Sequence, residues 1–125
     1  MMDRHQIGRY SRSKGKRYEL ELAHIFQNKG FSAVHRTAQC MGKTGAAGDL
    51  EGAPFIHIEC KAVEKLNLRD AIEQAVRDSK VNGKGHLPIV FHKKARKGWL
   101  VTMPIDDWFK LYDRYVKELN NSGDK

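Results

Sequence analysis

The chain has 125 residues, enough for one compact domain that buries most of its apolar surface without disulfides or structural metal. It carries 23 lysine and arginine residues against 15 aspartate and glutamate residues, a formal net charge of +8, which favours a polyanionic partner such as nucleic acid. The two cysteines, Cys40 and Cys60, suggest neither a disulfide framework nor a thiolate zinc site. With no apolar leader and no run of membrane-spanning length, we expect a cytoplasmic protein without a membrane partner.

The N-terminal half predicts a helix followed by three strands. Residues 1–13 are polar and basic without a hydrophobic period, which predicts a flexible arm. Residues 14–29 have apolar positions at helical spacing, and Gly30 ends that helix. Residues 31–36 read as a strand and 37–47 as a loop containing glycines. Residues 49–52 and 56–61 form a hairpin.

The C-terminal half predicts a helix, two strands and a last helix. Residues 68–81 carry an apolar face, and residues 87–92 and 99–103 are strands joined by the basic turn KKARKG. Pro104 suits the first turn of the last helix, and residues 121–125 should form a disordered tail. We therefore predict an α/β fold in a single domain, residues 14–120, with a central mixed sheet of about five strands flanked by helices.

The last helix has a wide apolar face. Its members Trp108, Phe109 and Tyr112, like Trp99 in the strand before it, lie at core spacing and are expected to pack. Leu111 lies outside the main stripe, which suggests a buried partner surface and hence a homodimer.

The stretch GKTGAAGDLEGAPFIHIECK, residues 42–61, has two interpretations. A phosphate loop would need a glycine where Thr37 stands and a helix directly after GKT, and GAAGDLEGAP cannot be that helix. We therefore predict no nucleotide cofactor. Lys43 is expected to contact a DNA backbone or solvent.

The other interpretation places two carboxylates side by side. A three-residue turn over residues 53–55 pairs Leu50 with Ile58 on the buried face and Asp49 with Glu59 on the other. His57, Glu59 and Lys61 then share a face that we expect to be accessible, with His57 a solvated strand histidine.

Two facing carboxylates offer oxygen ligands, which favour a hard cation, Mg²⁺, for which Mn²⁺ can substitute. Asp49, Glu59 and the Cys60 carbonyl would hold it, and Lys61 would orient a water or stabilise charge at phosphorus. A solvated ion pair is the alternative for the Glu-x-Lys pattern. The basic residues expected to contact phosphates are Lys14, Lys16, Arg36, Lys93 and Lys94.

KGKRYE on a helix, then GDL, IECK and another helix, resembles the PD-(D/E)XK nuclease superfamily, including archaeal Holliday junction resolvases and small phage-encoded endonucleases. The resemblance, over about residues 13–112, implies a restriction-endonuclease-like core. It also implies that Glu19 is a metal or water ligand and that Gln74 faces the site and contacts DNA. A salt bridge from Glu19 to Arg36 or Lys61, and an exposed amide for Gln74, remain alternatives. Gly48 replaces the motif's proline, and the loop QCMGKTG differs from the serine-bearing loop of the resolvases.

These observations predict an Mg²⁺-dependent endodeoxyribonuclease of a bacterial cell or phage-infected host. We expect a symmetric dimer that resolves four-way junctions by paired nicks, because a two-fold pair of sites delivers matched cuts. One alternative is a nuclease acting on DNA ends, flaps or foreign duplex. Another is a non-catalytic basic DNA-binding module with structural acidic residues.

Overall fold

The computed structural model describes residues 4–37 and 47–123, with side chains from residue 14 onward. The elements are α1 (Arg4–Asn28), β1 (His35–Arg36), β2 (Leu50–Glu51), β3 (Ile56–Lys61), α2 (Leu68–Asn82), β4 (Leu87–His92), β5 (Leu100–Thr102) and α3 (Ile105–Gly123). The strands form one sheet in the order β1-β2-β3-β4-β5, in which β3 and β4 are parallel and the other neighbours antiparallel. The predicted α/β class, mixed five-stranded sheet and element order are confirmed.

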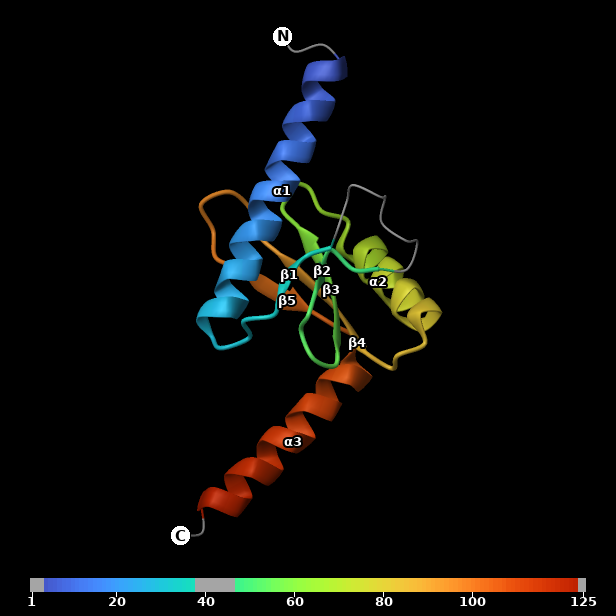
Figure 1. The fold of residues 1–125 in the computed structure, drawn as a ribbon. Coiled ribbons are helices and arrows are strands. Elements are labelled where there is room, and N and C mark those ends of the chain that lie inside the picture. Colours follow the sequence, from blue (N-terminus) through green and yellow to red (C-terminus); the bar gives the residue numbers. More distant parts are fainter. Residues whose placement is uncertain (1–3, 38–46, 124–125) are drawn as a thin grey trace.

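Helices α1 and α2 cover opposite faces of the sheet (Figure 1). On one face, Ile58 and Cys60 of β3 pack in a cluster with Leu22 of α1. On the other, Glu59 pairs in register with Val90 of β4, which packs against α2. Each fully buried Leu, Ile or Val contributes about 1.5–3 kcal/mol, so the two helices stabilise the sheet from both sides.

The predicted hairpin register is confirmed, because Leu50 pairs with Ile58. Several strands are shorter than predicted: β1 and β2 have two residues each and β5 has three. The loop that holds Cys40 and Lys43 lies outside the described residues.

The predicted exposure of the second face of β3 is wrong. His57 is 4% exposed and Glu59 is 1% exposed, so His57 is not a solvated strand histidine. The physical reason is α2, which returns over this face to connect β3 to the parallel strand β4. A parallel strand pair needs such a crossover, and the crossover helix buries the face that it covers.

Both predicted chain ends differ from the structure. Helix α1 begins at Arg4, so the predicted arm and the start at residue 14 are wrong for residues 4–13. Once a helix is nucleated, each added residue gains a hydrogen bond, which favours this extension. Helix α3 runs to Gly123, so the predicted disordered tail is wrong for residues 121–123. There the Ser122 hydroxyl donates to the Glu118 carbonyl at 2.8 Å.

Helix α3 extends away from the sheet, and none of its residues is buried (Figure 1). Packing of Trp108, Phe109 and Tyr112 into the core of their own chain was therefore a wrong prediction. They contact one another instead, with the rings of Trp108 and Tyr112 stacked at 4.9 Å between centroids. Trp99 does pack against the core. In the described part of the chain, no helix is long and apolar enough to cross a membrane.

Gly48 is required by a close backbone approach, and this predicts a stability difference. A Cβ at this position would lie 2.5 Å from the Ile58 carbonyl oxygen. Gly48→Ala must therefore push β2 from β3 and should destabilise the fold by about 1–3 kcal/mol in urea unfolding. Gly15→Ala, whose Cβ would meet nothing within 4 Å, should instead stabilise α1 by about 1 kcal/mol. Equal stabilities for the two variants would contradict this account.

Candidate active site

Asp49 is held at the entry to β2 by contacts on two sides. Its backbone N–H donates to the Ile58 carbonyl at 2.8 Å, and its carbonyl accepts from the Thr37 N–H at 3.1 Å. Its carboxylate accepts from the Cys60 N–H at 2.7 Å, so Oδ2 lies against β3 one residue beyond Glu59. The Asp49 carboxylate is thus fixed by the hairpin backbone and is only 9% exposed.

Several predicted site residues change the pKa of the Cys60 thiol. Burial is the largest effect and raises its pKa, and the negative charges of Asp49 and Glu19 raise it further, while Lys61 lowers it. These three charged groups therefore gather near Cys60, at the carboxyl end of β3. The thiol stays protonated at neutral pH, which leaves the predicted carbonyl as the donor of Cys60 toward a hard cation.

Glu19 forms an ion pair in this structure. Its Oε1 accepts from Arg36 Nε at 2.9 Å, and the two side chains are 16% and 23% exposed. The salt-bridge alternative for Glu19 is therefore present, and it joins α1 to β1 across the sheet edge. Arg36, predicted to contact DNA, carries its guanidinium against this carboxylate.

The Glu59 side chain lies on the α2 face of the sheet, opposite to the side chain of Cys60, in a polar cluster with His57. His57 Nε2 is 3.0 Å from Glu59 Oε1, and Asn82 Nδ2 is 3.4 Å from His57 Nδ1. A carboxylate only accepts, so Nε2 of a neutral His57 would donate to Glu59 and Nδ1 would accept from Asn82. Without a cation, this assignment satisfies both ring nitrogens and orients the Glu59 carboxylate; a cation in this region would take the place of the proton on Nε2.

Asp78 of α2 completes the cluster. Ligand atoms of His57, Glu59 and Asp78 all lie within 4.8 Å of one another. Two carboxylates and an imidazole fit a divalent cation, and the imidazole makes the set suitable for Mn²⁺ as well as Mg²⁺. Among the described residues, Glu59 therefore lies close to His57 and Asp78. It also directly precedes Cys60, whose N–H donates to the Asp49 carboxylate.

Asp78 and Asn82 were not predicted from the sequence as site residues, and His57 was predicted only as a solvated strand histidine. The buried positions of α2 are Ala71, Ala75 and Ser79. Asp78 and Asn82 continue this stripe of small residues at helical spacing, so they face the sheet. Polar residues that extend a buried stripe of small residues were the available signal.

The predicted DNA contacts lie in different surroundings. Lys16 and Lys94 are exposed, Gln74 is half-buried on α2, and Lys43 falls outside the described residues. Lys14 lies 6.0 Å from the Tyr18 ring centroid. Lys93 is held closely: its Nζ is 3.3 Å from Glu21 Oε1 and 5.3 Å and 5.5 Å from the ring centroids of Tyr18 and Trp99.

One family model matches most of the chain. The family model described as "Phage putative PDDEXK endonuclease" matches residues 10–123. The chain belongs to this family. It is thus a nuclease of the PD-(D/E)XK superfamily, as the GDL and IECK motifs predicted.

A solved structure is similar to this nuclease. It is the Archaeoglobus fulgidus Hjc, a Holliday junction resolvase from an archaeal hyperthermophile, at 27% identity and a TM-score of 0.53. The similarity covers 72% of each chain. The comparison with curated proteins yields no match. The fold of the nuclease is the restriction-endonuclease-like one that the resemblance implied.

The His57–Glu59–Asp78 cluster predicts a measurable metal effect. Mn²⁺ should raise the melting temperature of the nuclease, because an ion that binds only the folded chain at about 100 times its Kd adds about 2.7 kcal/mol. Asp78→Asn should remove most of that gain. Asp113→Asn, an equal charge change on exposed α3, should retain it. If Asp78→Asn keeps the full Mn²⁺ shift and Asp49→Asn loses it, the cation lies at the Asp49 side instead.

Proposed function

We propose that this nuclease is a divalent-metal-dependent endonuclease for branched DNA, a Holliday junction resolvase that makes paired symmetric nicks. The observation that carries the proposal is the Leu50–Ile58 register, in which the Asp49 carboxylate accepts a hydrogen bond from the N–H of Cys60, between Glu59 and Lys61. The similarity to the archaeal resolvase over 72% of each chain supports the choice of substrate. The nuclease would act in the cytoplasm of a bacterial or phage-infected cell.

The residues divide into metal ligands and a charge-stabilising lysine. Asp49, Glu59, the Cys60 carbonyl and Glu19 would hold Mg²⁺ or Mn²⁺, which when bound polarises the phosphodiester and makes a bound water more acidic. Lys61 would orient the attacking water or offset charge at phosphorus. The hydrogen bond from the Cys60 N–H keeps the Asp49 carboxylate turned toward β3. Glu59 would be shared between this site and the His57–Glu59–Asp78 cluster, and when that cluster holds no cation His57 would orient Glu59 as an outer partner.

Basic residues on both sides of this region would hold the DNA backbone. Lys14, Lys16 and Arg36 lie on α1 and β1, and Lys93 and Lys94 follow β4. Lys43 and Gln74 remain proposed DNA contacts. Phosphate contacts of this kind fix orientation without base preference and weaken steeply with salt.

Cleavage of a labelled four-way junction tests the proposal against its alternatives. With Mg²⁺ the native chain should nick two opposed strands of the junction and leave a linear duplex of the same sequence intact. Asp49→Asn and Lys61→Ala should lower the rate by about 10²–10³-fold or more, because each removes a group aimed at the reacting phosphate. Lys29→Ala, at an exposed lysine beyond α1, is the matched control and should cut normally.

Other outcomes select the alternatives. Equal cutting of junction and duplex, still dependent on Asp49 and Lys61, would indicate a nuclease for ends, flaps or foreign duplex. Binding without cleavage under Mg²⁺ and Mn²⁺ would indicate a non-catalytic DNA-binding module.

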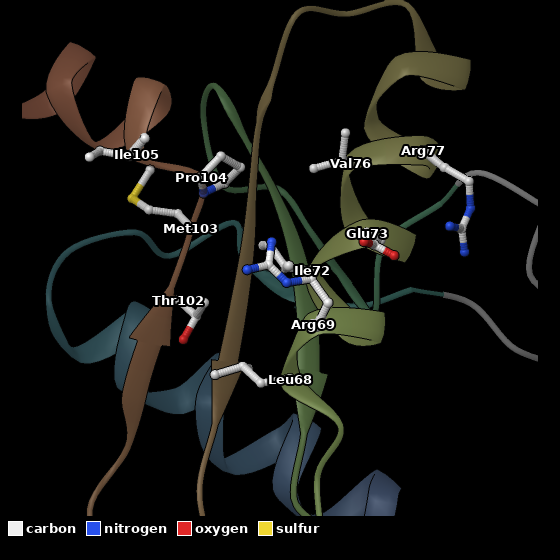
Figure 2. A pocket seen from close by; sticks show the side chains of 10 residues that line it. All are labelled: Leu68, Arg69, Ile72, Glu73, Val76, Arg77, Thr102, Met103, Pro104 and Ile105. Atoms are coloured by element: carbon white, nitrogen blue, oxygen red, sulfur yellow. The ribbon is translucent and has the colours of Figure 1, made fainter.

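A homodimer through α3 is part of this proposal. The helix exposes a continuous apolar face, and a groove of about 810 Å³ lies at its N-terminal end. Figure 2 shows the two sides of this α2–α3 groove: Leu68, Ile72 and Val76 come from α2, Met103 and Pro104 from the β5–α3 connection, and Ile105 from the start of α3. Exposed apolar surfaces of this extent mark interaction sites. A second copy would cover the face by a two-fold contact, which also supplies the second active site for a paired nick.

A charge placed on the apolar face of α3 should break this dimer. Leu119 is 50% exposed and belongs to that face, and its neighbour Asn120 is exposed beside it. Leu119→Lys should shift the mass measured by light scattering from dimer to monomer, because a lysine cannot be buried there unpaired. Asn120→Lys adds the same charge and should remain dimeric. A native chain that is monomeric at high concentration would rule out this contact.

A further inference from the structure

A second groove lies beyond the carboxyl ends of the parallel strands β3 and β4. It has a volume of about 780 Å³ and is formed by residues 63–66 and Leu68, which follow β3, and by residues 92–94 and 97–100 at the end of β4. We refer to it as the lysine groove. In open α/β sheets, ligands bind outside the carboxyl ends of parallel strands, and the volume falls within the range of ligand sites.

The rim of the lysine groove is strongly basic. Four lysines line it, namely Lys65, Lys93, Lys94 and Lys97. Lys93 is held against Glu21 and two aromatic rings, so Lys65, Lys94 and Lys97 are the exposed cations. Glu64 is the carboxylate in the lining, and its Oε1 accepts from the Ala95 N–H at 3.4 Å, across the groove's two loops. The groove therefore favours an anionic ligand.

The floor of the lysine groove is apolar and partly aromatic. Val63 and Leu100 are 45% and 63% exposed, and Trp99 and Leu66 lie beside them. His92 also lines the groove, and burial lowers the pKa of its imidazole, so that ring is neutral at physiological pH. An anion with a flat apolar body matches this combination better than a bare phosphate does.

The groove adjoins the proposed active site. His92 stands directly beside Lys61 in the parallel β3–β4 register, and the Lys93 N–H donates to the Lys61 carbonyl at 3.1 Å. A ligand in the groove would therefore lie next to a phosphate held at Lys61. In duplex DNA the base faces are covered by stacking, so only an unpaired base can present its face to an apolar floor.

We propose that the lysine groove binds an unpaired nucleotide of the DNA substrate, with its base on the apolar floor and its phosphates on the exposed lysines. This inference rests on the proposed function and adds the feature by which branched DNA is told from duplex. The arms of a four-way junction are base-paired up to the branch point, but the pairs there lack a stacking neighbour on one side, so a base can leave its partner and enter the groove. A continuous duplex offers none.

Fluorescence of Trp99 tests the groove. Trp99 and Trp108 are the two tryptophans, so a Trp108→Phe background makes Trp99 the sole reporter. The Asp49→Asn change is added, and divalent ions are omitted, so that no cleavage intervenes. A short single-stranded oligothymidine should quench the signal saturably, while a blunt duplex of equal length and an abasic strand should quench it weakly.

Variants test the phosphate contacts and the base contact of the nucleotide separately. Lys94→Ala with Lys97→Ala should reduce the slope of log affinity against log salt by about 2, one for each lysine that contacts phosphate. Arg114→Ala with Lys117→Ala, an equal charge loss on α3, should leave it unchanged. Leu100→Ser should remove the preference for oligothymidine over the abasic strand.

The groove proposal fails if duplex or abasic strand quenches Trp99 as strongly as oligothymidine does. It also fails if the two double variants behave alike. Because this is a binding assay without metal, it is independent of cleavage. Quenching with no junction cleavage would overturn the nuclease proposal alone, whereas junction cleavage without quenching would overturn the groove alone.

Discussion

The structure depends on one constraint: β3 carries an ionisable site residue while both of its faces are covered by helices. An ionised carboxylate taken out of water loses several kcal/mol of hydration unless partners offset the loss. Glu59, 1% exposed, meets His57 at 3.0 Å, and His57 in turn meets Asn82 of α2. The chain of polar contacts therefore sets where α2 can sit. The same contacts join α2 to β3 and orient a proposed metal ligand.

The β2–β3 hairpin positions the other proposed carboxylate ligand, Asp49. Pairing of Leu50 with Ile58 directs apolar side chains into the α1 cluster and at the same time brings Asp49 to the backbone N–H of Cys60. Gly48 permits the approach because the Ile58 carbonyl occupies the space of a Cβ. In this chain the closeness of Ile58 therefore excludes the Cβ of a proline at position 48, and the carboxylate that follows is fixed by β3.

Local signals in the sequence predicted the elements well and their exposure poorly. The turn length and the apolar pair Leu50–Ile58 determined the register, and Gly30 ended the first helix where a positive φ was needed. The burial of His57 and Glu59 could not be predicted from strand alternation, because it depends on how α2 docks. The position of α3 is a similar case. A wide apolar stripe indicates that a helix is covered, but the stripe does not say whether the same chain covers it.

The two grooves are neighbours, and this links the proposed dimer to the proposed recognition of DNA. Leu68, at the start of α2, lines both the lysine groove and the α2–α3 groove. A second copy seated along α3 would therefore lie close to one wall of each lysine groove, and the two-fold axis would fix the separation of the two grooves. Because a four-way junction presents its exchanging strands in symmetric pairs, a fixed separation would select DNA in which two bases released at the branch point are correctly spaced. Substrate choice would then reside in the assembly, while each chain supplies the cleavage chemistry.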